Sequence, residues 1–145
     1  MDFSPDGKRL AVNGQDQHGE VWDPATGERL LLLQGHTGQV QEIHFSHDGR
    51  YLVTAANDNS VRVWAAANGT QLIAYTQPVP GGMGMAHFSA DDQSVIAWGW
   101  KETFYRFIFQ DFDQLLEIVR SRVVRDWKPE ECRVYLRAET CPELP

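Results

Sequence analysis

The 145-residue chain has little cysteine, no long apolar run and fewer basic than acidic side chains. Its two cysteines, Cys132 and Cys141, are too few to build a disulfide-stapled fold or, without histidine, a tetrahedral zinc site. Apolar runs such as Leu30–Leu33 are far too short to span a bilayer. The first residues show no basic stretch followed by an apolar core, so we expect no signal peptide in them. We therefore expect a cytoplasmic protein with no membrane partner.

The charge balance restricts the class of partner. The chain has 13 Lys and Arg against 20 Asp and Glu, which gives a net charge of −7. Neutralising a phosphate backbone requires an excess of Lys and Arg, so we expect no nucleic-acid partner. Hydrophobic residues make up 42% of the chain and charged residues 23%, a composition that is ordinary for a folded globular protein rather than a disordered one.

One segment recurs three times in the first 110 residues. Phe3–Leu10 (FSPDGKRL) is repeated by Phe45–Leu52 (FSHDGRYL) after 42 residues and, more weakly, by Phe88–Val95 (FSADDQSV) after a further 43. A second landmark keeps the same step, because an aromatic residue follows each of these phenylalanines by 19 positions: Trp22, Trp64 and Phe107. A period of about 40–45 residues is typical of the blades of a β-propeller.

The middle unit shows the pattern of four short strands. Apolar and β-branched residues gather at 40–45, 51–55, 61–64 and 72–75, and the segments between them are rich in Asp, Asn and Gly, which suit tight turns. Strands of this length and spacing predict an antiparallel all-β fold. A β-sandwich would give similar strands, but the fixed period favours a propeller.

The density of charge changes near residue 110. Residues 1–110 hold 19 charged side chains and residues 111–145 hold 14, so we place a boundary between about two and a half blades (1–110) and a tail (111–145). Apolar residues in the tail follow helical spacing from 112 to 127, which predicts a helix over about 112–126. The third unit offers only three strands before this helix. We expect an incomplete ring with a C-terminal helical cap that packs on its own blades, although such a helix could also bind a partner.

The middle unit carries a specific motif, Gly35-His36, Thr54, Asp58 and Trp64. In residue type and spacing it resembles the WD-repeat family, and the resemblance covers residues 1–109. It implies four-stranded antiparallel propeller blades and a structural chain of hydrogen bonds through His36, Thr54, Asp58 and Trp64. In the first unit, Asp16 and Trp22 keep two of the positions while Val12 replaces the hydroxyl, so we expect a partial network there. The third unit has lost all four members together.

Two chemical alternatives arise from the same residues. Thr54, His36 and Asp58 have the residue types of a hydrolytic triad, but a hydroxyl inside a strand has no adjacent loop to form an oxyanion hole. Four histidines raise the question of a metal site: His36, His44, His47 and His87. However, His44 and His47 lie on either side of a strand–turn boundary, and this spacing gives no reason for their side chains to converge. We expect no catalytic residues, no metal and no cofactor.

The tail resembles something narrower. Residues 125–131, Tyr135-Leu136 and Thr140-Cys141-Pro142 are similar to the C-terminal tail of large bacterial multidomain WD-repeat signalling proteins. The resemblance implies a parent protein with an N-terminal signalling domain. Cys132 stands where that family commonly has Trp, and the usual cysteine of the preceding helix is absent, so we expect no disulfide or paired-thiol role for the tail cysteines.

The sequence therefore predicts a non-catalytic protein–protein interaction scaffold or sensor module from the C-terminal part of a WD40 propeller. Its expected partners are an unidentified protein and, at the open ends of the ring, either the rest of the propeller or a second copy of the chain. An enzyme built on a propeller and a self-assembling structural repeat are the alternatives.

Overall fold

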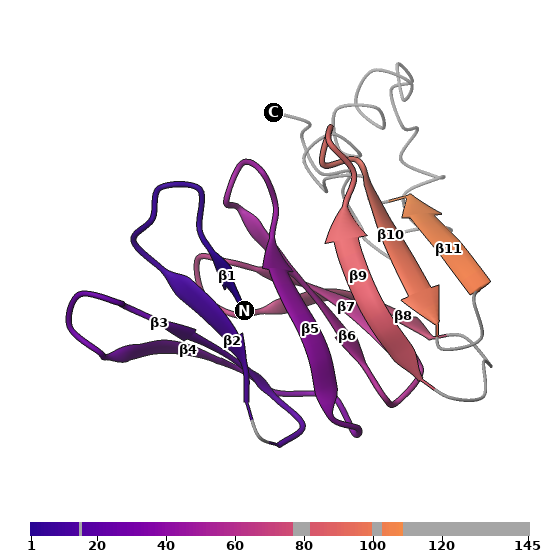
Figure 1. Cartoon of the computed structure of the whole chain (residues 1–145), viewed down its shortest axis with the longest axis horizontal. Coiled ribbons are helices and arrows are strands. Elements are labelled where there is room, and N and C mark those ends of the chain that lie inside the picture. Colours follow the sequence, from indigo (N-terminus) through magenta and orange to yellow (C-terminus); the bar gives the residue numbers. More distant parts are fainter. Residues whose placement is uncertain (15, 77–81, 100–102, 109–145) are drawn as a thin grey trace, which may run out of the picture. The chain divides into compact units, whose positions relative to one another are not determined.

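A computed structural model describes residues 1–14, 16–76, 82–99 and 103–108. These residues form eleven β-strands in three antiparallel sheets, in each of which strands adjacent in sequence are paired (Figure 1). The described part contains no helix, and so none that could cross a membrane. The predicted all-β antiparallel architecture is confirmed for this part. The predicted helix over 112–126 and the helical cap lie outside the described residues.

The first sheet, here called blade 1, has four strands in the order β1-β2-β3-β4. Its strands are β1 Asp2–Phe3, β2 Leu10–Asn13, β3 Gly19–Trp22 and β4 Arg29–Leu33. A bulge between Val21 and Trp22 shifts the pairing of β3 with β4. The alternation of buried and partly exposed residues along β3 shows that one side of this sheet faces a core.

The second sheet, blade 2, follows the order β5-β6-β7-β8. Its strands are β5 Val40–Phe45, β6 Tyr51–Ala56, β7 Ser60–Ala65 and β8 Gln71–Thr76. Each contains one of the four strands predicted from the sequence and extends it by at most one residue at either end. The central strands β6 and β7 are mostly buried on both sides, as expected for a sheet covered on two faces.

The third sheet, blade 3, has three strands in the order β11-β10-β9. Its strands are β9 Met83–Phe88, β10 Ser94–Gly99 and β11 Thr103–Ile108. Among the described residues, β11 pairs with β10 and with no other strand. One edge of β11 therefore has no backbone hydrogen bonds to another strand among the described residues.

The recurring segment forms the same turn in every blade. In blade 2, the Ser46 hydroxyl donates to Asp48 over 2.7 Å and accepts the Tyr51 amide over 2.9 Å, and Gly49 follows with a φ of 71°. Blade 3 repeats these bonds through its own serine and aspartate, but Asp92 occupies the position of the glycine with a φ of 53°. The repeat is weaker in sequence there because Asp92 replaces the glycine of the other two units. The turn keeps its shape because Asp92 adopts the left-handed conformation, which is costly for residues other than glycine.

Two apolar cores lie between consecutive blades. The first core joins blades 1 and 2 and contains Ala11, Val21, Leu33, Ile43, Phe45, Leu52, Trp64 and Ala66. The second core joins blades 2 and 3 and contains Val53, Ala55, Val61, Val63, Met83, Ala86, Phe88, Val95 and Ala97. Successive residues of β6 enter different cores, so blade 2 is packed between its neighbours.

The side of blade 3 that points away from the second core is largely apolar and exposed. We call its apolar part the outer face. It consists of Met85, Ile96, Trp98, Phe104 and Ile108, whose exposed fractions range from 39% to 70%. Two exposed polar residues, His87 and Arg106, lie opposite Ile96 on the same side. Met85 and Phe104 lie opposite Trp98 on the two neighbouring strands, so these three side chains form one row. The outer face therefore has the composition of a surface that packs against protein.

Candidate functional site

Four residues of the motif in blade 2 form one chain of hydrogen bonds. The Trp64 indole N–H donates to the Thr54 hydroxyl over 2.9 Å, and Thr54 Oγ1 lies 2.7 Å from His36 Nε2. The other ring nitrogen of His36 lies 3.0 Å from Asp58 Oδ2. Because an indole can only donate, the Thr54 hydroxyl accepts from Trp64 and is left to donate to Nε2. This pattern assigns the ring proton of His36 to Nδ1, where it is donated to Asp58.

Asp58 is the most highly connected member of the chain. Its carboxylate also accepts the Ser60 hydroxyl over 2.6 Å, the Ser60 amide over 3.0 Å and the Thr37 amide over 2.9 Å. Burial alone would raise the pKa of Asp58, but the bonds from Ser60, Thr37 and His36 together hold that pKa below its ordinary value. The carboxylate therefore stays ionised and the loop before β7 is tied to the segment before β5.

His36 stays neutral in this environment. Its side chain is fully buried, and burial lowers the pKa of the imidazole although the hydrogen bond to Asp58 works in the opposite direction. A neutral ring fits the bonding pattern, because Nε2 must keep its lone pair to accept from Thr54.

Gly35 places His36 in the network. Its φ is 154°, a conformation that side chains of L residues disfavour, and a Cβ there would collide with the Arg62 guanidinium and lie 3.4 Å from the Trp64 ring. The glycine of the Gly-His pair therefore has a backbone cause: a φ of 154° strains any L side chain, and a Cβ would in addition displace the Arg62 guanidinium.

The same geometry removes the Thr54 hydroxyl from any substrate. Thr54 has an exposed fraction of 0%, and both Trp64 and His36 use its oxygen. A nucleophile needs an accessible path to the carbonyl that it attacks, together with donors for the resulting oxyanion. The arrangement of His36, Thr54, Asp58 and Trp64 is suited to fixing the register of β6 and β7 rather than to bond cleavage.

Blade 1 joins different residues from those expected. The Trp22 indole donates to Glu20 Oε2 over 2.9 Å, and Arg29 lies 3.0 Å from the other oxygen of Glu20. In the described residues no bond joins Trp22 to Asp16, which instead lines an open pocket of about 420 Å³ beside His36. Val12 lies opposite Glu20 and offers no hydroxyl, so the carboxylate of Glu20 supplies the acceptor for the indole.

A second group of ionisable side chains was not anticipated. Glu42 Oε2 lies 3.4 Å from His44 Nε2 and 3.5 Å from His87 Nε2, and the rings of His44 and His87 are 4.0 Å apart. Two of the four histidines therefore lie in contact. The pair is His44 with His87, and not His44 with His47. The repeat indicates that these two histidines occupy equivalent positions, because each directly precedes the phenylalanine of its unit.

Comparison with known families supports the motif in the middle of the chain. The family model for the WD domain, G-beta repeat, matches residues 27–65, a range that contains all four residues of the His36 network. No curated protein sequence matches the chain. Residues 125–142 lie outside the family match, and neither comparison supports the resemblance of the tail to bacterial signalling proteins.

Proposed function

We propose that the chain is a non-catalytic protein-interaction module, built from WD-type blades, that binds a partner through the outer face of blade 3. The WD repeat at residues 27–65 and the blade-like sheets support this class of function, since propeller blades present rigid surfaces to other proteins. The outer face is the observation that carries the proposal.

The outer face is too apolar to be an ordinary solvent-facing surface. Phe104 and Ile108 are 67% and 70% exposed, and the Trp98 and Phe104 rings stack with their centroids 5.1 Å apart. Single exposed apolar residues are common, but several in one cross-strand row mark an interaction surface. Large aromatic side chains of this kind dominate the free energy of protein–protein contacts.

The occupant that best fits this face is blade 1 of a second copy of the chain. Blade 1 exposes apolar residues at its own end of the three-blade unit, with Phe3 at 56% and Met1 at 82% exposure. The chain already packs one blade on the next twice, through the first and second cores. A contact between blade 3 of one copy and blade 1 of another would continue this series head to tail.

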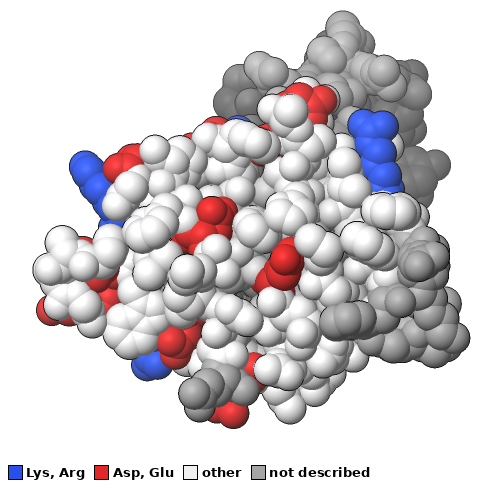
Figure 2. Space-filling view, viewed as in Figure 1, with Lys and Arg blue, Asp and Glu red and all other residues white. Residues whose placement is uncertain are grey.

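The distribution of charge favours a protein partner over nucleic acid. Acidic side chains are spread across the face shown in Figure 2, while Lys and Arg lie near its periphery. The net charge of −7 adds to this pattern. A phosphate backbone would be repelled by such a surface, whereas an apolar face of protein would not.

Sedimentation velocity over a concentration series up to tens of micromolar tests the proposal. We expect the wild-type chain to self-associate and the double variant Trp98→Ser/Phe104→Ser to remain monomeric. Leu72→Ser is the matched control, because Leu72 is 45% exposed on β8, away from the outer face, and should associate as the wild type does.

Three results would count against the proposal. A wild-type chain that stays monomeric and unfolds cooperatively over the whole series would exclude the second copy as occupant. Association that survives in Trp98→Ser/Phe104→Ser would place the contact on another surface. Hydrolysis of ester or peptide substrates that Thr54→Ala abolishes would replace the interaction module by an enzyme.

A further inference from the structure

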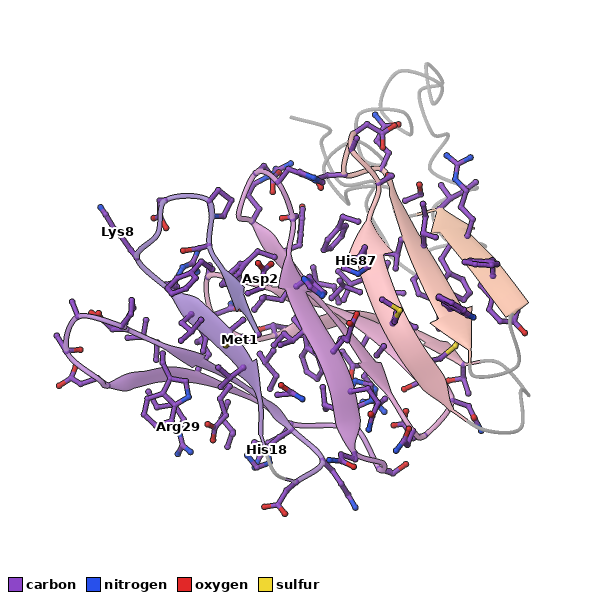
Figure 3. All side chains as sticks on the ribbon, viewed as in Figure 1. Met1, Asp2, Lys8, His18, Arg29 and His87 are labelled. Atoms are coloured by element: carbon purple, nitrogen blue, oxygen red, sulfur yellow. The ribbon has the colours of Figure 1, made fainter. Side chains whose placement is uncertain are left out.

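The first strands of the three blades carry ionisable residues at equivalent positions. β5 contacts both β1 and β9, and Figure 1 shows the three strands side by side. The residue before the repeated phenylalanine is Asp2 in β1, His44 in β5 and His87 in β9. Figure 3 shows Asp2 and His87 on either side of β5. The repeat therefore places three ionisable side chains close together, and Glu42 of β5 is the fourth.

Glu42 is left without a hydrogen bond at this place. Its Oε2 atom is buried and has no hydrogen-bond partner, although the two nearest imidazole nitrogens are only 3.4 and 3.5 Å away. Buried carboxylate oxygens are normally hydrogen-bonded, because an unpaired one loses its hydration without compensation. In the described residues Glu42 forms no ion pair with Lys or Arg, so the structure offers no cation for it other than the histidines.

Two of the separations match those between ligands of one metal ion. Zinc binds imidazole nitrogen and carboxylate oxygen at about 2.0–2.2 Å, so two ligands of a tetrahedral ion lie roughly 3.3–3.6 Å apart. Glu42 Oε2 lies at 3.4 and 3.5 Å from the two imidazole nitrogens. One ligand atom each from Glu42, His44 and His87 lies within 4.8 Å of the others. We propose that Glu42, His44 and His87 form a binding site for Zn²⁺ between blades 2 and 3.

Asp2 would orient one of the ligands. Its Oδ2 accepts the Phe45 amide over 2.9 Å, which holds the carboxylate in place, and lies 3.5 Å from His44 Nδ1. A carboxylate beside one ring nitrogen favours the proton there and leaves Nε2 with its lone pair directed at Glu42. Zinc-bound histidines commonly have such a carboxylate behind them.

The charges around the site suit a divalent cation. Asp2 and Glu42 contribute two carboxylates. Among the described residues, the other ionisable groups at the site are the histidines themselves and His47, which lines the same pocket and pairs with Asp92.

An ion can reach the site and keep an open position there. His87 is 50% exposed, and a pocket of about 310 Å³ is lined by Asp2, His44 and His87 together with Phe45 and Phe88. Three protein ligands would leave the fourth position of a tetrahedral ion for water or for a side chain of a partner. The bound ion would also join β5 to β9, so binding should stabilise the packing of blade 3 on blade 2.

Isothermal titration of the full chain with Zn²⁺ tests the proposal. The background is Cys132→Ser/Cys141→Ser, which removes the two thiols that could bind zinc elsewhere in the chain. We expect one ion per chain, and at least a tenfold weaker affinity in His87→Ala, His44→Ala and Glu42→Gln. Asp2→Asn should weaken binding by about tenfold, as expected for an outer carboxylate. His47→Ala is the matched control, because His47 lines the same pocket but lies outside the cluster, and its affinity should stay within twofold of the background.

Two further measurements make the outcome decisive. The melting temperature should rise with Zn²⁺ in the background protein and in His47→Ala, and should not change with Zn²⁺ in His87→Ala. The visible spectrum of Co²⁺ bound in place of Zn²⁺ should show the intense bands of a tetrahedral ion. Absence of binding, or equal weakening in His47→Ala and His87→Ala, would overturn the proposal. His87→Ala leaves Trp98 and Phe104 intact, so zinc binding and self-association are tested in different variants.

Discussion

Two clusters of histidine and carboxylate, one within blade 2 and one between blades 2 and 3, differ in how their polar atoms are satisfied. In the first, both ring nitrogens of His36 and both oxygens of Asp58 have partners between 2.6 and 3.2 Å away. In the second, Glu42 Oε2 is buried with no hydrogen bond, and His44 and His87 approach it only to 3.4 and 3.5 Å. In the first cluster His36 and Thr54 are buried. The second opens to solvent on the side of His87.

The difference separates a structural role from a ligand-binding one. A polar group that is fully paired inside a protein contributes to a unique register and has nothing left to offer a ligand. A polar group that is buried and unpaired is costly to keep and gains when an ion or molecule supplies the missing contact. Residue types alone do not distinguish these cases, since both clusters consist of histidine and a carboxylate.

The largest expected effect comes from removing one carboxylate charge from each cluster. Asp58→Asn loses the acceptor for at least one of His36, Thr37 and Ser60, so the free energy of unfolding should fall by about 1–3 kcal/mol. Glu42→Gln changes an oxygen, Oε2, that has no hydrogen-bond partner among the described residues. Without metal, its free energy of unfolding should stay within about 0.5 kcal/mol of the wild type. Urea denaturation of both variants, in buffer with a chelator, provides the measurement. An equal decrease in the free energy of unfolding of the two variants would show that the two carboxylates do not differ in how well they are paired.

A smaller effect is expected from the glycine that precedes His36. Gly35→Ala places a Cβ against the Arg62 guanidinium and the Trp64 ring at a φ of 154°. We expect a loss of about 1–2 kcal/mol in the free energy of unfolding, from backbone strain together with displacement of Arg62. Gly27→Ala is the control, because its φ is 70° and nothing lies within 4 Å of the added Cβ, so only backbone strain remains. A loss in Gly35→Ala no greater than in Gly27→Ala would show that the blade tolerates the displacement.

The smallest effect concerns pH. The pKa values of His36 and His87 are lowered by burial, so below about pH 6.5 the unfolded chain binds protons that the folded chain does not, and stability falls as the pH decreases. The lowered pKa of Asp58 adds stability that is present above about pH 4 and is lost as the pH falls through that pKa. Melting temperatures measured between pH 7.5 and 5 should therefore decrease, and less steeply in His87→Ala. A melting temperature that is constant over this range would contradict burial as the dominant cause.

The blades and the His36 network illustrate what the sequence can reveal. Strands β5–β8 follow from local alternation and turn residues, and the spacing of His36, Thr54, Asp58 and Trp64 is recognisable because a network leaves a fixed pattern within one repeat. The partner of Trp22 was harder to predict. Asp16 holds the expected position, but the indole donates to Glu20 on its own strand, and Glu20 is itself held by Arg29.

The Glu42 cluster depends on contacts between repeats rather than within one. His44 and His87 are 43 positions apart, and their meeting requires adjacent first strands whose side chains point into the same space. Local patterning along one strand carries no information about which residue of the next blade lies alongside. Aligning the three repeats on their phenylalanines would have shown Asp2, His44 and His87 in one column, although not the distances that make them a site.

Asp92 has a mechanical consequence for the junction of blades 2 and 3. It adopts a left-handed conformation in the β9–β10 turn, and its carboxylate accepts the amides of His47 and Asp48 over 3.1 Å each and lies 2.8 Å from the His47 ring. A force that pulls the two turns apart would load these bonds in parallel, so all must yield together rather than one after another. This end of the junction should therefore resist separation most strongly, and the two blades should begin to separate elsewhere along their contact.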